Sequence, residues 1–146
     1  MGTEENKAII GRFIDELLNQ GALAAIPEIV DSSYIMHGAG TDVSGHQGVQ
    51  RFVVTYRTAL PDYHCTIEDQ MAEGDKVVTR WTVRGTQRGE LPGIPPTGKP
   101  ITLEGIVIDR IANGKLAETW LQADSLGMMQ QLGLIPAPAE RGATRS

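Results

Sequence analysis

The stretch GKLAETWLQADSLGMMQQLG, residues 114–133, carries a carboxylate, Asp124, where an alternating strand pattern changes into a helical one. A carboxylate at such a junction has two possible roles. It can cap the helix, because Asp is among the best N-cap residues, or it can act as a general acid or base. The roles conflict, since hydrogen bonds from helix amides stabilise the charged form and weaken the base. Ser125 is the alternative cap, which would leave Asp124 free.

The strand before this junction also predicts which side chains share a face. Alternation places Glu118, Trp120, Gln122 and Asp124 on one side of the sheet. If Trp120 faces a cavity, Asp124 faces it as well. An apolar cavity would raise the pKa of the carboxyl group toward the range in which a general acid or base works best.

Four further side chains are candidates for binding a substrate. Trp81 and Trp120 are the two tryptophans of the chain, and each lies in the middle of a predicted strand. There each can form a flat wall of a pocket or pack in the core. His37 follows a short predicted strand, where it can donate a hydrogen bond to a substrate carbonyl or lie at the surface. Gln122 is included because it shares the face of Trp120.

The spacing of apolar residues predicts the elements that position these side chains. The predicted helices cover residues 4–20, a short segment near 27, and 46–60; the predicted strands cover a brief segment before 37, then 63–72, 75–89, 101–112 and 115–124. Helices followed by a meander indicate an α+β fold, because the connections are too short for crossover helices. One curved sheet should wrap the helices and enclose a pocket. Glu104 and Asp109 lie on opposite faces of one strand, so only one can point inward.

Composition limits the class of protein. The chain has 146 residues, a formal net charge of −5 and 40% hydrophobic residues, which is typical of one domain with its own core. No basic stripe predicts a nucleic-acid partner. The single Cys65 cannot form an intramolecular disulfide, and no Cys/His cluster has zinc-ligand spacing. An acidic N-terminus and the lack of a long apolar run predict a cytoplasmic protein without a membrane partner. Residues 1–135 are expected to form the domain, and residues 136–146 a disordered tail.

Two segments resemble the SnoaL-like polyketide cyclases: residues 59–101, ALPDYHCTIEDQMAEGDKVVTRWTVRGTQRGELPGIPPTGKPI, and residues 114–133. The resemblance extends to about Ile135. It implies an NTF2-like conical α+β barrel with a cavity between sheet and helices, and commonly a homodimer. It also implies an intramolecular aldol ring closure without a metal or organic cofactor, with an Asp at the end of the last strand as acid and base. Asp124 matches that position, whereas Val107 departs from the polar residue that many members carry.

The resulting hypothesis is a cofactor-independent cyclase that acts on an apolar, carbonyl-bearing small molecule, with Asp124 as the general acid and base. An epoxide hydrolase or a ketone isomerase could use the same type of pocket. A non-enzymatic, small-molecule-binding dimer is the other alternative, and there Asp124 would be only a helix cap. The alternating Thr, Arg and apolar residues of the convex sheet face favour a homodimer.

Overall fold

The computed structural model describes residues 2–38 and 42–136, which form six strands and several helices in an α+β arrangement. The elements in chain order are α1 (Thr3–Arg12), η1 (Phe13–Asn19), η2 (Leu23–Ala25), α2 (Ile26–Ile29), β1 (Val30–His37), β2 (Val43–Ser44), α3 (Gly45–Ala59), β3 (His64–Glu73), β4 (Lys76–Thr86), β5 (Pro100–Ala112), β6 (Lys115–Ala123) and α4 (Ser125–Gln131). The tail predicted to be disordered lies outside the described residues, except for Pro136.

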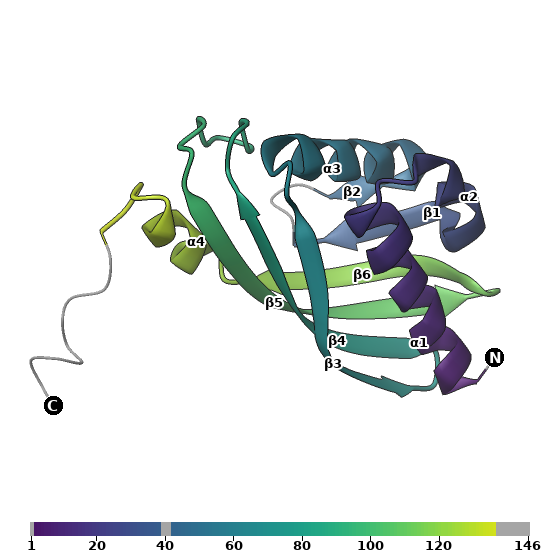
Figure 1. Cartoon of the computed structure of the whole chain (residues 1–146). Helices are drawn as coiled ribbons and strands as arrows, with labels where there is room; N and C mark the ends of the chain where they lie inside the picture. The colour runs from purple at the N-terminus through teal and green to yellow at the C-terminus, as the bar shows by residue number, and fades with distance from the viewer. Residues whose placement is uncertain (1, 39–41, 137–146) are drawn as a thin grey trace, which may run out of the picture.

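The six strands form one curved, unclosed sheet in the order β2-β1-β6-β5-β4-β3. Neighbouring strands are antiparallel except for β1 and β6, which run parallel. The helix α1 crosses one face of the sheet, α3 packs beside β1 and β2, and α4 projects from the end of β6 (Figure 1). The predicted α+β class is confirmed. The parallel pairing of β1 with β6 was not part of the predicted antiparallel meander.

The first long helix buries one apolar side against the sheet. It runs through α1 and continues as the wider, π-helical segment η1, and it ends before Gly21, whose φ of +69° is a conformation that favours glycine. The buried side chains on this helix include Ile10, Phe13, Ile14, Leu17 and Leu18. Among the described residues, no helix is both long enough and apolar enough to cross a membrane.

The strand β5 contains a glycine because a neighbouring ring occupies the space above it. A side chain at Gly105 would collide with the indole of Trp81 and with the carbonyl oxygen of Gln122. Gly105 pairs with Trp81 across β4 and β5, so the ring lies over the backbone of its own cross-strand partner. The glycine therefore provides room for the largest side chain on the inner face of β4.

The last helix is held to the sheet by Gln131, whose side chain forms two hydrogen bonds with the backbone of β5, as a neighbouring strand would. The amide of Gln131 accepts a hydrogen bond from the backbone N–H of Thr102 at 2.7 Å and donates one to the carbonyl of Thr102 at 2.9 Å. Lys99 donates another to the carbonyl of Leu132 at 3.3 Å. These contacts place α4 beside the end of β5.

Candidate active site

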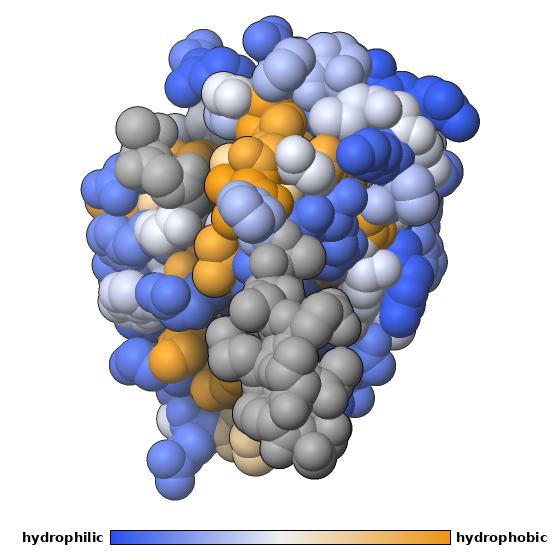
Figure 2. Space-filling view, turned by 90° about the vertical axis from the view of Figure 1, so that its left-hand side faces the viewer, coloured by the Kyte–Doolittle hydropathy of each residue, from blue (hydrophilic) through white to orange (hydrophobic). Residues whose placement is uncertain are grey.

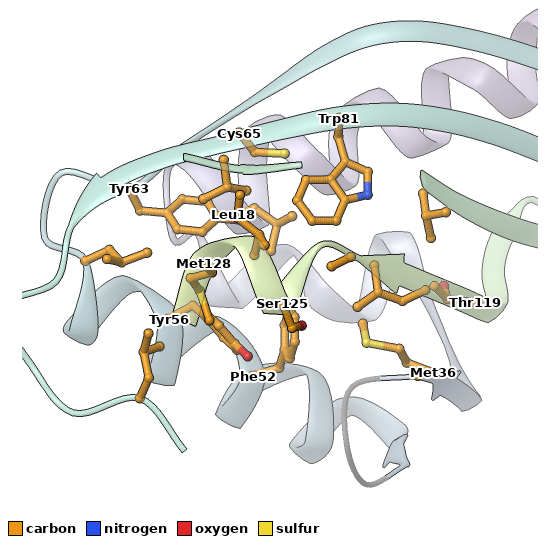
Figure 3. A pocket seen from close by; sticks show the side chains of 18 of the residues that line it. Leu18, Met36, Phe52, Tyr56, Tyr63, Cys65, Trp81, Thr119, Ser125 and Met128 are labelled. Carbon is orange, nitrogen blue, oxygen red and sulfur yellow. The ribbon is translucent and has the colours of Figure 1, made fainter. Parts of the chain in front are cut away.

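A cavity of about 480 Å³ lies between the inner face of the sheet and the helices. Its wall is mostly apolar, and side chains from several elements project into it (Figure 3). The aromatic rings in the wall come from Phe13, Phe52, Tyr56, Tyr63 and Trp81. This volume and lining are typical of a site for a small apolar molecule.

The cavity reaches the surface at the end of the molecule that carries α4. Four of its lining residues are exposed: Gly38, which follows β1, and Pro92, Gly93 and Ser125. Pro92 and Gly93 belong to the connection between β4 and β5, and Ser125 is the first residue of α4. Apolar side chains gather on this face of the molecule (Figure 2). The apolar wall therefore continues to the point where a ligand would enter.

A buried chain of polar groups lies on the sheet side of the cavity. Asp109 on β5 and Thr119 on β6 are direct cross-strand partners, and both line the cavity. The hydroxyl of Thr119 donates a hydrogen bond to Oδ1 of Asp109 at 2.5 Å. Tyr34 on β1 donates one to Oγ1 of Thr119 at 2.7 Å. Three neighbouring strands thus contribute one polar group each.

The carboxyl group of Asp109 is placed to exchange a proton near neutral pH. Its residue is 4% exposed. Burial raises the pKa of Asp109 from 3.8 to about 7, and the hydrogen bond from Thr119 offsets part of the rise. The side chains of Arg110 and Glu118, which neighbour Asp109 and Thr119 in sequence, form an ion pair at 3.1 Å on the opposite face of the sheet. Within residues 2–38 and 42–136, the carboxyl therefore has no positive neighbour that would keep it ionised at low pH.

Two phenols and a thiol line a part of the cavity away from Thr119. The rings of Tyr56 and Tyr63 lie at one end of the close view and Thr119 at the other (Figure 3). Burial raises the pKa of both phenols, so they stay protonated and can donate hydrogen bonds. Burial also raises the pKa of the Cys65 thiol to about 12, which leaves it a poor nucleophile.

Asp124 lies outside this cavity, and the prediction that it faces the cavity is wrong. Its Oδ1 accepts a hydrogen bond from the backbone N–H of Gly127 at 2.9 Å, so the side chain caps α4. The residue is exposed, and it is absent from the cavity lining. Ser125, which we expected as the alternative cap, lines the cavity instead.

The predicted alternation in β6 is confirmed, but its direction is the reverse of the one assumed. Thr119, Leu121 and Ala123 line the cavity. Trp120 and Gln122 occupy the alternate positions on the outer face, and Asp124 follows in the same series. Alternate residues of a strand face the same side, so a wrong assignment of the side for Trp120 gives a wrong side for Gln122 and Asp124 as well.

His37 also lies on the outer face, where it contacts Trp120. The two rings stack with their centroids 5.7 Å apart. Nε2 of His37 lies 2.7 Å from Oε2 of Glu118. The predicted binding residues His37, Trp120 and Gln122 are thus absent from the cavity lining. Trp81 is the member of that set that lines the cavity.

The sequence contains a signal for Asp109 that the prediction did not use. On β5 the positions that share its parity are Ile101, Leu103, Gly105, Val107 and Ile111. The alternate positions include Thr102, Glu104 and Arg110. The more apolar set is the one expected to face inward, and Asp109 is the charged residue within it. A lone carboxylate in an apolar set is a candidate for a perturbed pKa.

No three His, Cys, Asp or Glu side chains gather as a metal-binding group within residues 2–38 and 42–136. The donor groups of the cavity are instead one carboxyl, several hydroxyls and a buried thiol.

Solved structures with the same fold include proteins from several bacteria. TsrD from Streptomyces laurentii is 26% identical, with a TM-score of 0.84 over 92% of this chain and 99% of its own. A protein from Bacillus cereus described as a candidate polyketide cyclase is 31% identical, with a TM-score of 0.75 over 90% of this chain and 82% of its own. AclR from Streptomyces galilaeus, described as a candidate hydroxylase, is 24% identical, with a TM-score of 0.83 over 99% of this chain and 95% of its own.

The AclR comparison concerns the fold alone. A search of curated proteins finds no match. The family model described as SnoaL-like polyketide cyclase matches residues 8–132, which include all of β1 to β6 and α4. The chain therefore belongs to the SnoaL-like polyketide cyclase family.

Proposed function

We propose that the cavity binds an apolar, carbonyl-bearing small molecule and that Asp109 is the general acid and base for its aldol-type ring closure. One observation carries this proposal: a carboxyl group with a pKa of about 7 lies in the wall of a mostly apolar cavity. A pKa near the working pH allows one group both to accept and to return a proton.

The proposed reaction needs two proton transfers and one carbon–carbon bond. The ionised form of Asp109 takes a proton from a carbon next to a carbonyl group, and the resulting enolate attacks a second carbonyl carbon of the same molecule. The new alkoxide then takes the proton back from the neutral carboxyl, so the enzyme returns to its starting state. General acid–base catalysis of this kind contributes about 10²–10⁴-fold in rate.

The lining next to Asp109 supports cyclisation over epoxide hydrolysis. A hydrolase needs polar groups that hold an attacking water beside its carboxylate. Val107 and Leu121, the neighbouring inward residues on β5 and β6, are apolar and pair directly across the two strands. A ketone isomerase would use Asp109 in the same way as a cyclase, and product analysis separates the two reactions. The name given to AclR illustrates that this fold does not determine the reaction.

The test compares two aspartates that lie on either side of the sheet. Wild type, Asp109→Asn and Asp124→Asn are incubated with a panel of linear compounds that carry carbonyl groups at alternate carbons, and products are identified by mass spectrometry and NMR. We expect Asp109→Asn to lower turnover by about 10²-fold or more, because an amide takes no proton at neutral pH. Asp124→Asn should retain turnover, because Asn caps helices as well as Asp does.

Full turnover of the Asp109→Asn variant on a compound that the wild type cyclises would contradict the proposal. If Asp124→Asn were the inactive variant, the acid and base would be the residue at the end of the last strand after all. Products with a shifted double bond and no new ring would identify an isomerase.

A further inference from the structure

Tyr34 is a buried polar residue that the proposed reaction does not use. It is 0% exposed, and it is absent from the cavity lining. Its hydroxyl nevertheless reaches Thr119, which does line the cavity, at 2.7 Å. The phenol therefore contacts the acid–base group only through an intermediate side chain.

The direction of the hydrogen bonds in this chain follows from the groups themselves. Burial raises the pKa of Tyr34, so the phenol stays protonated and is a donor. Oγ1 of Thr119 accepts that hydrogen, and its own single hydrogen then points to Oδ1 of Asp109, at 2.5 Å. Oδ1 is therefore occupied by a donor, whereas Oδ2 makes no hydrogen bond to the protein among the described residues.

We infer that Tyr34 is a positioning residue that orients the Thr119 hydroxyl toward Oδ1 of Asp109 and so makes Oδ2 the atom that exchanges a proton with the ligand. This inference rests on the proposed function, in which Asp109 is the acid and base. A proton carried by Asp109 then resides on Oδ2, because Oδ1 already faces the hydrogen of Thr119.

Removal of the phenol hydroxyl would free Thr119 to turn. Its hydrogen could then point to another acceptor, and Oγ1 could accept a hydrogen from Oδ1 of the neutral Asp109. This alternative holds the proton inside the protein, away from the ligand. It also withdraws a donor from the carboxylate, which disfavours the charged form.

Among the residues that the structure describes, Tyr34 is the titratable group that hydrogen bonds link to Asp109, through Thr119. Val77 on β4 pairs with Asp109, and the first long helix contributes apolar side chains to the cavity, such as Ile10 of α1 and Ile14 of η1. Lys76, which ends the same strand pair, is exposed and makes an ion pair with Asp75 at 3.4 Å. Arg110 and Glu118 pair with each other on the outer face. The hydrogen bonds from Tyr34 through Thr119 are therefore the polar contacts that can change the pKa of Asp109.

The test follows the titration of Asp109 in the full-length protein and needs no substrate. NMR of protein isotope-labelled at the aspartate side-chain carboxyl carbons gives the midpoint of each carboxyl, and the Asp109→Asn variant identifies the Asp109 signal. We expect Thr119→Val to move this midpoint upward by about one pH unit and Tyr34→Phe by about half as much. Thr119→Ser keeps the hydroxyl and should restore the wild-type midpoint.

The matched control is Tyr63→Phe, which also removes a buried phenol hydroxyl, but from a position away from Thr119. It should leave the Asp109 midpoint unchanged. An unchanged midpoint in a folded Tyr34→Phe variant, or an equal shift in Tyr63→Phe, would overturn the inference. If Tyr34→Phe does not fold, Thr119→Val and Thr119→Ser still decide whether the hydroxyl chain sets the midpoint.

The outcome is separable from that of the proposed function. A cyclisable compound found in the panel should show a lower kcat in Tyr34→Phe, with the rising limb of its pH profile moved upward and KM nearly unchanged. Full turnover of Asp109→Asn would defeat the proposed function whatever the midpoints are. An unshifted Tyr34→Phe midpoint with an inactive Asp109→Asn would defeat the role of Tyr34 alone.

Discussion

The two faces of the sheet treat the same chemical group in opposite ways. On the inner face, burial raises the pKa of Asp109 to about 7. On the outer face, the hydrogen bonds from His37 and Arg110 lower the pKa of Glu118, and desolvation there is a smaller opposing effect. Asp109 and Glu118 lie on adjacent strands of one sheet. The face of the sheet on which a carboxylate lies, rather than its residue type or its place in the strand, therefore decides whether it can exchange protons near neutral pH.

The outer face differs also in what its apolar side chains contact. The large apolar residues exposed on it include Ile35, Ile106, Ile108 and Trp120. They lie on the neighbouring strands β1, β5 and β6, and Ile108 pairs directly with Trp120. Contiguous apolar side chains on a sheet face are typical of a protein–protein contact. We therefore propose that this face is the contact of a homodimer.

Removal of the Asp109 charge from the inner face should change the free energy of unfolding by the largest amount. Burial of Asp109 favours the neutral carboxyl, whose stabilising contribution is complete below the unfolded pKa near 3.8 and is lost as the pH rises through about 7. The two pKa values differ by an amount that corresponds to about 4 kcal/mol. Asp109→Asn carries no charge, so its free energy of unfolding relative to wild type should be higher at pH 8 than at pH 4 by roughly that amount.

Denaturant unfolding of both proteins at the two pH values measures this difference. A difference between variant and wild type that does not change with pH would show that the Asp109 carboxyl is solvated in the folded protein.

The second prediction concerns the proposed dimer contact on the outer face. Ile108→Lys places a charge in the middle of the exposed apolar set, and we expect it to weaken the dimer by about 10²-fold or more, because a buried unpaired charge is costly. Sedimentation of the wild type should give about twice 15.8 kDa and of the variant a mass that falls on dilution. Val54→Lys is the control, since Val54 is similarly exposed but lies on α3. A wild type that sediments as a single chain at all concentrations would rule out the proposed homodimer.

A smaller effect concerns the end of β6, where Asp124 and Ser125 divide the roles of cap and cavity lining. Asp124→Ala should lower the free energy of unfolding by about 1 kcal/mol, because the hydrogen bond to the N–H of Gly127 is lost. Ser125→Ala should change it much less, since its hydroxyl does not cap α4. Thermal unfolding of the two variants gives the comparison, and a larger loss for Ser125→Ala would assign the cap to Ser125.

The smallest change in stability is expected for Glu118, whose pH dependence should be opposite to that of Asp109. The lowered pKa of Glu118 contributes stability above its unfolded pKa, and this contribution is lost as the pH falls through the folded pKa. The hydrogen bond to Glu118 raises the pKa of His37, so the contribution of His37 is lost as the pH rises through its folded value. Glu118→Gln should therefore be less stable than wild type near pH 6 and nearly equal to it at pH 3. Both groups are solvated, so the effect should shrink in high salt.

The face of the sheet that lines the cavity could be predicted less well than the strands themselves. The alternation in β6 was correct residue by residue, yet Trp120, which was assumed to point inward, lies on the face opposite to the cavity. Asp109 was recognised as one of two residues on β5 of which only one could face inward. Choosing it required a comparison of the two faces of β5, where the set that contains Asp109 is the more apolar one.

The order of the helices and strands, the end of the first helix at Gly21, and the grouping of side chains by face all follow from local rules, because apolar spacing and backbone preferences act over a few residues. The tertiary structure alone decided which face the helices cover, that β1 pairs in parallel with β6, and that Tyr34, Thr119 and Asp109 meet. Asp109 and Thr119 are 10 positions apart on neighbouring strands, whereas Tyr34 and Thr119 are 85 positions apart. Alternation is symmetric between the two sides of a strand, so it cannot say which side will be buried; the packing of α1, η1 and α3 on one side breaks that symmetry and gives Asp109 its environment.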